Sequence, residues 1–297
     1  MASRSPIHVL EIALDPQASS DRETLLAALA PLCAETPSLA VMVDRESGFV
    51  IVKGMEEAQL EAVVERLQRE CAAEFSAGEP QVTYRETVAK ASNADYTLKK
   101  PASGTDAGQF ACVRLRLDPL PPGSGFIFEN RAPADAVPAQ YLPGIEKGIA
   151  LASEGGSLAG FPLIDLKASL IGGAYDDAVS SPAAFEIATG MALREALAEA
   201  GPTLLEPLMQ LWVVTPTDHA TEALRGLTSR HGTILINSQR EGTAIIEAEV
   251  LMSSLLGFAA ALRDKTNGRA QSSMRLLHFQ PTRQRPRGPD ARAAAAA

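Results

Sequence analysis

The sequence has few of the residues that metal binding, redox chemistry and membrane insertion require. Its 297 residues include three cysteines, four histidines and one tryptophan. The cysteines lie far apart, without a CxxC pair or a zinc-ligand spacing, which is typical of free thiols in a reducing compartment. No apolar run approaches the ~18 residues of a membrane span, and no secretory signal is visible at the start. We therefore expect a cytoplasmic protein with no metal site and no membrane partner.

Signatures of catalysis and nucleotide binding are also missing. No GxxxxGK[ST] phosphate loop occurs, and no GxGxxG follows an expected strand. The histidines show neither metal-ligand spacing nor an HExxH motif, and no GxSxG elbow supports a Ser-His-Asp triad. We therefore expect no catalytic residues and no cofactor in this chain, which offers no place for a nucleotide or its magnesium ion.

The charge is unevenly distributed. The formal net charge is −9, and the segment after Gln280 holds four arginines against Asp290, a contribution of 4 − 1 = +3. The body of the chain is therefore −9 − 3 = −12. An acidic body disfavours nonspecific nucleic-acid binding over the whole surface, so any RNA contact must be local. Residues 282–297 have low complexity, and we expect them to form a disordered basic and alanine-rich tail.

Hydrophobic periodicity predicts that residues 1–79 and 202–281 share one plan, β-α-β-β-α-β. In the first domain we expect a strand at 7–14, a helix capped by Ser20 or Asp21, a hairpin around 45–48, a helix at 57–70 and a strand within 72–82. In the last domain we expect a strand at 204–215, a helix at 216–230, a hairpin at 233–250, a helix at 253–266 and a strand at 271–279.

Residues 80–201 follow a different pattern. We expect strands at 82–88, 96–100, 110–117 and 162–170, with a turn-rich connector at 119–125. Helices are expected from about 138 to 152 and from 181 to 200, the second with Ser180 or Ser181 as its cap and Pro182 at its first position.

Ten segments, spread over the three expected domains, carry a resemblance to a known family. They are GMEEAQLEAVVERL (54–67), GEPQVTYRE (78–86), PPGSGFIFE (121–129), VPAQYLPGIEKG (137–148), LAGFPLIDLK (158–167), FEIATGMALRE (185–195), GPTLLEPLM (201–209), RGLTSRHGTILI (225–236), GFAAALRDKT (257–266) and GRAQSSM (268–274). In this order they resemble elongation factor G, and the resemblance covers about residues 7–280.

The resemblance implies an α+β architecture of the family's domains III, IV and V. Two ferredoxin-like domains would flank a ribosomal-protein-S5-like domain with a left-handed βαβ crossover. It also implies ribosome binding in translocation or a related step of protein synthesis, by a monomer whose partners are ribosomal RNA, ribosomal proteins and an N-terminal GTPase domain. GTP and magnesium would belong to that GTPase domain, so this chain itself would not be an enzyme.

The family reaches the decoding centre through two tip loops of domain IV. These match residues 103–111, with Gly108, Gln109 and Phe110 as candidate RNA contacts, and residues 172–181, with Tyr175, Asp176 and Asp177. Glycine lets backbone approach RNA, and aromatic rings can stack on bases. The alternatives for Phe110 and Tyr175 are side chains turned into a core.

Three positions depart from the family's tip pattern. The family usually has an arginine where Ala107 stands, a histidine where Asp176 stands and an acidic residue where Val179 stands. These changes favour a divergent paralogue for recycling or regulation. A free-standing ribosome-binding adaptor or inhibitor is the other alternative.

In the last domain, the resemblance points to a large-subunit RNA face. Its candidate residues are Arg225, Arg230, His231 and Arg240. The alternative is that these residues are ordinary solvated side chains without an RNA partner.

Overall fold

The computed structural model describes residues 7–44, 47–101 and 108–282. The described chain divides into two compact units. One contains the residues up to Thr83 together with 206–280, and the other contains 84–205 with residues 281 and 282. Within the described ranges, no helix combines the length and the apolar character that crossing a membrane requires.

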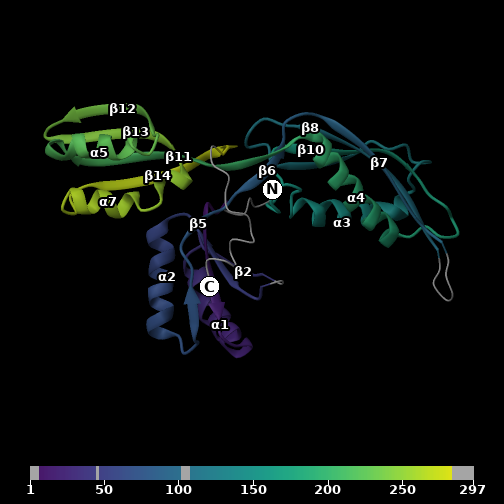
Figure 1. The fold of residues 1–297 in the computed structure, drawn as a ribbon, viewed down its shortest axis with the longest axis horizontal. Helices are drawn as coiled ribbons and strands as arrows, with labels where there is room; N and C mark the ends of the chain where they lie inside the picture. The colour runs from purple at the N-terminus through teal and green to yellow at the C-terminus, as the bar shows by residue number, and fades with distance from the viewer. Residues whose placement is uncertain (1–6, 45–46, 102–107, 283–297) are drawn as a thin grey trace. The chain divides into compact units, whose positions relative to one another are not determined.

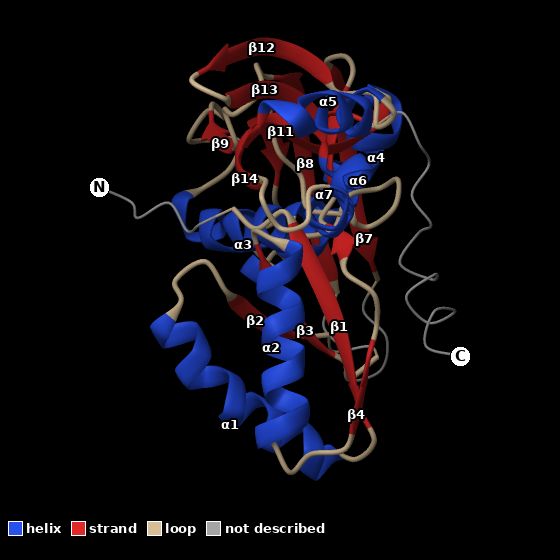
Figure 2. Cartoon of the chain, turned by 90° about the vertical axis from the view of Figure 1, so that its left-hand side faces the viewer, coloured by secondary structure: helices blue, strands red, loops and turns tan. Residues whose placement is uncertain are grey.

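The N-terminal part of the first unit has the ferredoxin-like order of elements. They are β1 (Leu10–Pro16), α1 (Ser19–Glu35), β2 (Ala40–Val43), β3 (Val50–Gly54), α2 (Glu57–Glu70) and β4 (Phe75–Ala77). The strands lie in the order β2-β3-β1-β4, and β5 (Gln81–Val82) also pairs with β1. Both helices contact the sheet (Figure 2), α1 through buried leucines and α2 through buried leucines and valines, which explains the apolar periodicity of the α2 sequence.

The cap expected for α1 was wrong. The helix has Ala18 as its N-cap, and the carboxylate of Asp21 accepts a hydrogen bond from the backbone N–H of Ala18 at 3.1 Å. Asp21 therefore lies at the third helical position and reaches back, as an acidic residue in a capping box does.

The C-terminal part of the first unit repeats the same order. Its elements are β11 (Pro202–Pro216), α5 (Ala220–Thr228), β12 (Thr233–Arg240), β13 (Thr243–Leu251), α6 (Met252–Leu255), α7 (Phe258–Lys265) and β14 (Gln271–Pro281). The strands lie in the order β12-β13-β11-β14. The helix expected at 253–266 is broken into α6 and α7, because Gly257 between them has a φ of +69°. This left-handed conformation interrupts a helix, and glycine adopts it without steric cost.

The second unit contains a four-stranded sheet covered on one face by two helices (Figure 1). Its elements are β6 (Arg85–Val88), β7 (Ser92–Lys100), β8 (Gln109–Pro119), β9 (Phe126–Asn130), α3 (Leu142–Ser153), β10 (Leu166–Ala174) and α4 (Pro182–Ala200). The sheet order is β7-β8-β10-β9, and β9 runs parallel to β10. The α3 helix lies in the connection between these parallel strands. The left hand of this crossover stays a prediction.

Three sequence expectations in this unit need correction. The strand expected at 82–88 splits at Thr83 and Tyr84, because Val82 pairs with β1 whereas β6 pairs with the start of β11. Strand β9 was missed, since its five residues follow a segment dominated by turn signals. The strand expected at 162–170 begins only at Leu166, because the backbone just before it bonds to Glu86 instead.

Candidate functional site

The two expected tip segments meet in the second unit. The backbone N–H of Phe110, at the start of β8, donates to the carbonyl of Val179 at 3.4 Å. The hydroxyl of Ser180 donates to the carbonyl of Phe110 at 2.7 Å. Gly108 and Gln109 precede this junction and are partly exposed. Residues 103–107 of the first loop, including Ala107, lie outside the described residues.

The second tip segment is a turn organised by Asp176. Its carboxylate accepts from the N–H of Ala178 at 2.9 Å, and its carbonyl accepts from the N–H of Ser180 at 2.8 Å. The N–H of Asp176 donates to the hydroxyl of Ser180 at 2.9 Å. Asp176 and Asp177 are exposed. Where the resemblance expects a histidine, the aspartate therefore serves as a turn-forming residue.

Sequence reasoning missed the role of Ser180, which it considered only as a helix cap. The cap is Ser181, whose hydroxyl accepts from the N–H of Ala184 at 3.1 Å, with Pro182 as the first helical residue. Ser180 instead joins the two tip segments. The run SSP in the sequence was the signal that both serines have positional roles, one on each side of the helix start.

Tyr175 is anchored to the core of the unit. Its ring centroid lies 5.7 Å from that of Tyr141, which in turn stacks on Phe185 at 4.7 Å. Tyr175 and Phe110 are both only partly exposed. These contacts fix the position of the tip relative to α4, while RNA contact by either ring stays a prediction.

A buried carboxylate holds the loop that precedes β10. Glu86 is fully buried and accepts from the N–H groups of Leu158, Ala159 and Phe161 at 2.8–3.0 Å. A Cβ atom at Gly156 would lie only 2.1 Å from an oxygen of Glu86. Glycine at this position therefore lets the loop close around the carboxylate.

The face of the β7-β8-β10-β9 sheet opposite the helices is lined with charged side chains. Alternate residues of β8, Val113, Leu115 and Leu117, are buried in the core, so Arg114 and Arg116 project from the open face. The same alternation places Asp95 and Lys99 of β7, Lys167 of β10 and Glu129 of β9 on this face. Arg131, just after β9, joins them through its ion pair with Glu129.

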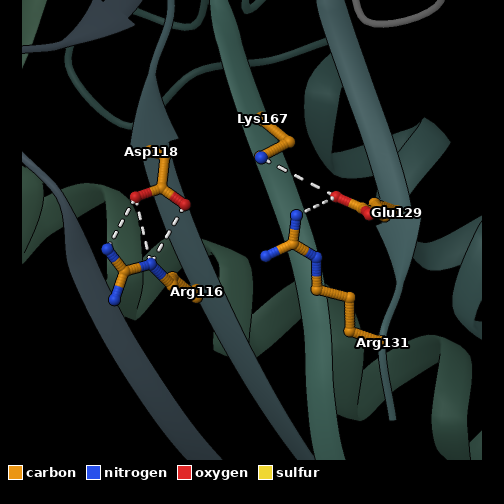
Figure 3. Close-up of polar contacts among 5 residues, drawn as sticks. All are labelled: Arg116, Asp118, Glu129, Arg131 and Lys167. Atoms are coloured by element: carbon orange, nitrogen blue, oxygen red, sulfur yellow. Dashed lines mark hydrogen bonds and ion pairs between the residues drawn. The ribbon is translucent and has the colours of Figure 1, made fainter.

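The carboxylates of the open face are engaged by cations (Figure 3). Arg116 donates from Nε and Nη2 to the carboxylate of Asp118 at 2.8–3.0 Å. One carboxylate oxygen of Glu129 lies 2.8 Å from Nη2 of Arg131 and 3.7 Å from Nζ of Lys167. Hydrogen bonds from Arg116 lower the pKa of Asp118. Hydrogen bonding by Arg131 likewise lowers the pKa of Glu129. Arg114 pairs with Asp95 at 2.8 Å.

The expected large-subunit face of the first unit is not one cluster. Arg225 is paired with Glu222 at 3.2 Å, and the guanidinium of Arg230 lies over the Phe258 ring at 5.4 Å. His231 is exposed in the turn before β12, with a φ of +57°. Arg240 ends β12, so about 23 Å of strand separates it from that turn.

Comparison with known proteins assigns each part of the chain. Residues 5–79 match the family model for elongation factor G domain III, residues 80–201 match domain IV, and residues 203–288 match the elongation factor G C-terminus. Within the described residues, no group of three or more histidine, cysteine, aspartate or glutamate side chains is arranged to hold a metal ion.

Individual relatives agree with these matches. Elongation factor G of Anaplasma phagocytophilum (strain HZ) is 44% identical over 275 residues, which are 93% of this chain and 40% of that protein. The protein of the same name from Paracoccus denitrificans (strain Pd 1222) is 44% identical, over 93% of this chain and 39% of that protein. A crystal structure of a protein from Thermus thermophilus superposes with a TM-score of 0.74 at 33% identity, covering 99% of this chain and 43% of the other.

Along the sequence, two ferredoxin-like domains flank a different α+β domain, and the three match three domain models of one family in order. These features define part of a translation elongation factor. The chain belongs to the elongation factor G family and comprises domains III, IV and V. It spans about 40% of the length of the curated relatives it matches.

Proposed function

We propose that this chain is the ribosome-binding part of an elongation-factor-G-like translation factor that acts in translocation or a related step. The observation that carries the proposal is the junction of the two tip segments, Phe110 with Val179 and Ser180, at one end of the domain IV sheet. Hydrogen bonds between the segments preorganise a tip, and preorganisation lowers the entropic cost of binding RNA.

The proposed chemistry is recognition, without a covalent step. Exposed tip residues contact ribosomal RNA, and Arg225, Arg230, His231 and Arg240 provide cationic contacts from the C-terminal domain. GTP and magnesium would be held by a GTPase domain that acts as a partner of these domains. The proposal places the factor in the cytoplasm as a monomer, with domain boundaries after residues 79, 201 and 281.

Co-sedimentation of the chain with vacant bacterial ribosomes across a salt series tests this function. We expect saturable binding at low salt that weakens as salt rises, because cations release counterions when they contact phosphates. No saturable binding at low salt would contradict the proposal.

A tip variant sharpens the test. S180A removes the hydroxyl that joins Phe110 to Asp176, so it should weaken ribosome binding. S153A is the matched control, because the Ser153 hydroxyl donates to the carbonyl of Ala150 within its own helix. Equal affinities of S180A, S153A and the parent chain would show that the joined tip does not contact the ribosome.

A further inference from the structure

We infer that the open face of the β7-β8-β10-β9 sheet is a second RNA-binding surface, which holds the phosphodiester backbone without reading base sequence. This inference rests on the proposed function, because it extends the RNA contact from the tip to the side of the same domain. The surface is defined by five residues and is called here the cationic face: Lys99, Arg114, Arg116, Arg131 and Lys167.

The cationic face has the opposite charge from the rest of the protein. Its five cations stand with three carboxylates, Asp95, Asp118 and Glu129, so its formal charge is 5 − 3 = +2. The remainder of the chain is then −9 − 2 = −11. A local positive field on a strongly acidic protein attracts polyanions to this face.

Its arginines are held ready for a further acceptor. The Arg114, Arg116 and Arg131 side chains are 56%, 47% and 53% exposed, while their carboxylate partners fix their orientation. Asp118 accepts hydrogen bonds from Nε and Nη2 of Arg116, which leaves Nη1 to donate to another oxygen. A guanidinium is a planar, multidentate donor that suits phosphate oxygens, so less entropy is lost when a phosphate binds.

The spacing of the cations fits a polymer of phosphates. Arg114 and Arg116 are two residues apart on β8, about 6.8 Å, which is comparable to the spacing of successive phosphates along an RNA strand. Lys167 faces Asp118 across the strand pair, and Ser169 lies in register between Arg116 and Glu129. The Ser169 hydroxyl is buried and makes no hydrogen bond within the described residues, so an unused donor stands among these cations.

The same face favours backbone contact over base recognition. Its strand positions carry one described aromatic ring, that of Phe110 at the tip end, so no aromatic side chain farther along the described face is available to stack on a base. Strand β8 runs from the tip at Gln109 past Arg114 and Arg116. An RNA strand that touches the tip can therefore continue along the cationic face.

Two matched double variants test the inference. R116Q/R131Q neutralises two exposed, ion-paired arginines of the cationic face. R66Q/R69Q removes the same charge from α2, where Arg66 and Arg69 are likewise exposed and paired with Glu70. Thermal unfolding first establishes that each variant is folded. The affinity for two labelled hairpin RNAs of equal length and different sequence is then measured across a salt series, with polyglutamate as a competitor.

We expect R116Q/R131Q to reduce the slope of log affinity against log salt by about 1.4 to 1.8 for both hairpins, equivalent to two phosphate contacts. R66Q/R69Q should leave the slope unchanged, and polyglutamate should compete poorly. Equal slopes for the two variants, absence of hairpin binding by the parent chain, or competition by polyglutamate as strong as by RNA would each overturn the inference. The last outcome would indicate an acidic protein as the partner.

Ribosome co-sedimentation separates this inference from the proposed function. If S180A weakens ribosome binding while R116Q/R131Q keeps the parent slopes for hairpins and ribosomes, the tip function stands and the cationic face is not an RNA surface. If the parent chain does not sediment with ribosomes but R116Q/R131Q still lowers the hairpin slope, the proposed function fails and the RNA-binding face remains.

Discussion

At the scale of single residues, the carboxylate of Glu86 organises the loop before β10. Three backbone N–H groups point at its two oxygens, and its own backbone bonds to the carbonyl of Pro162 and the N–H of Ile164. A residue of the short strand β6 thereby fixes a loop that lies more than seventy positions away in the sequence. Leaving a buried N–H group without an acceptor costs free energy, so Glu86 contributes more to the stability of the fold than a typical single side chain does.

We expect E86Q to destabilise the second unit by about 1–3 kcal/mol, because the new amide group faces backbone donors. Urea unfolding followed by circular dichroism measures the loss, and amide exchange should accelerate at Leu158 and Ala159. E154Q, an exposed substitution near the same loop, is the control. An unchanged urea midpoint for E86Q would mean that the hydrogen bonds between Glu86 and this loop contribute little to stability.

Asp118 provides a pH-dependent contribution. Hydrogen bonds from Arg116 hold its folded pKa below the ordinary value, with the charge of Arg116 adding to the effect. Such a group stabilises the fold above its unfolded pKa, about 3.9, and the contribution disappears as pH falls through the folded value.

R116Q should therefore lower the stability of the fold only slightly at neutral pH, since the pair is partly exposed and screened by solvent. The difference from the parent chain should vanish in acid, once Asp118 is protonated in both proteins. Urea midpoints measured from neutral pH downward check this. A difference that persists below the folded pKa would assign the effect to packing of the arginine stem.

At the scale of elements, the closeness of α3 and α4 depends on glycine. A Cβ atom at Gly144 of α3 would lie 2.0 Å from the carbonyl oxygen of Pro182, and one at Gly148 would lie 2.6 Å from that of Glu186. Backbone atoms cannot yield as flexible side chains do, so these two positions set the distance between the helices. Gly190 of α4, in contrast, has open space around its Cβ position.

G144A should destabilise the second unit by about 1–3 kcal/mol, because the added methyl group forces the helices apart. G190A should instead stabilise it by up to about 1 kcal/mol, since alanine favours the helix and nothing obstructs it. Denaturant unfolding of both variants gives the comparison. Stabilisation by G144A would show that the helices separate without cost.

At the scale of the whole molecule, the proposed RNA contact has to be local because the protein is acidic. The cationic candidates of the C-terminal domain lie at two places, with Arg230 near the end of α5 and Arg240 at the far end of β12. Their separation means that they would contact different phosphates and act independently.

R230A and R240A should each weaken ribosome binding and reduce its salt slope by about 1, with additive effects in the double variant. Co-sedimentation across a salt series measures the slopes. R230A also loses the contact with Phe258, so R230K, which keeps the charge, is the control for packing. An unchanged slope would remove the substituted arginine from the RNA face.

The sequence by itself determined the family, the two repeated β-α-β-β-α-β orders and local features such as Pro182 as the first residue of α4. These depend on periodicity and on contacts between neighbouring residues, which a sequence displays directly. Only the tertiary structure decided that residues 82–88 divide between two partner strands, that Ser180 joins the tip segments and that Glu86 is enclosed by a distant loop. Each depends on pairing between residues far apart in the chain, where the alternation of polar and apolar residues leaves the choice of partner open.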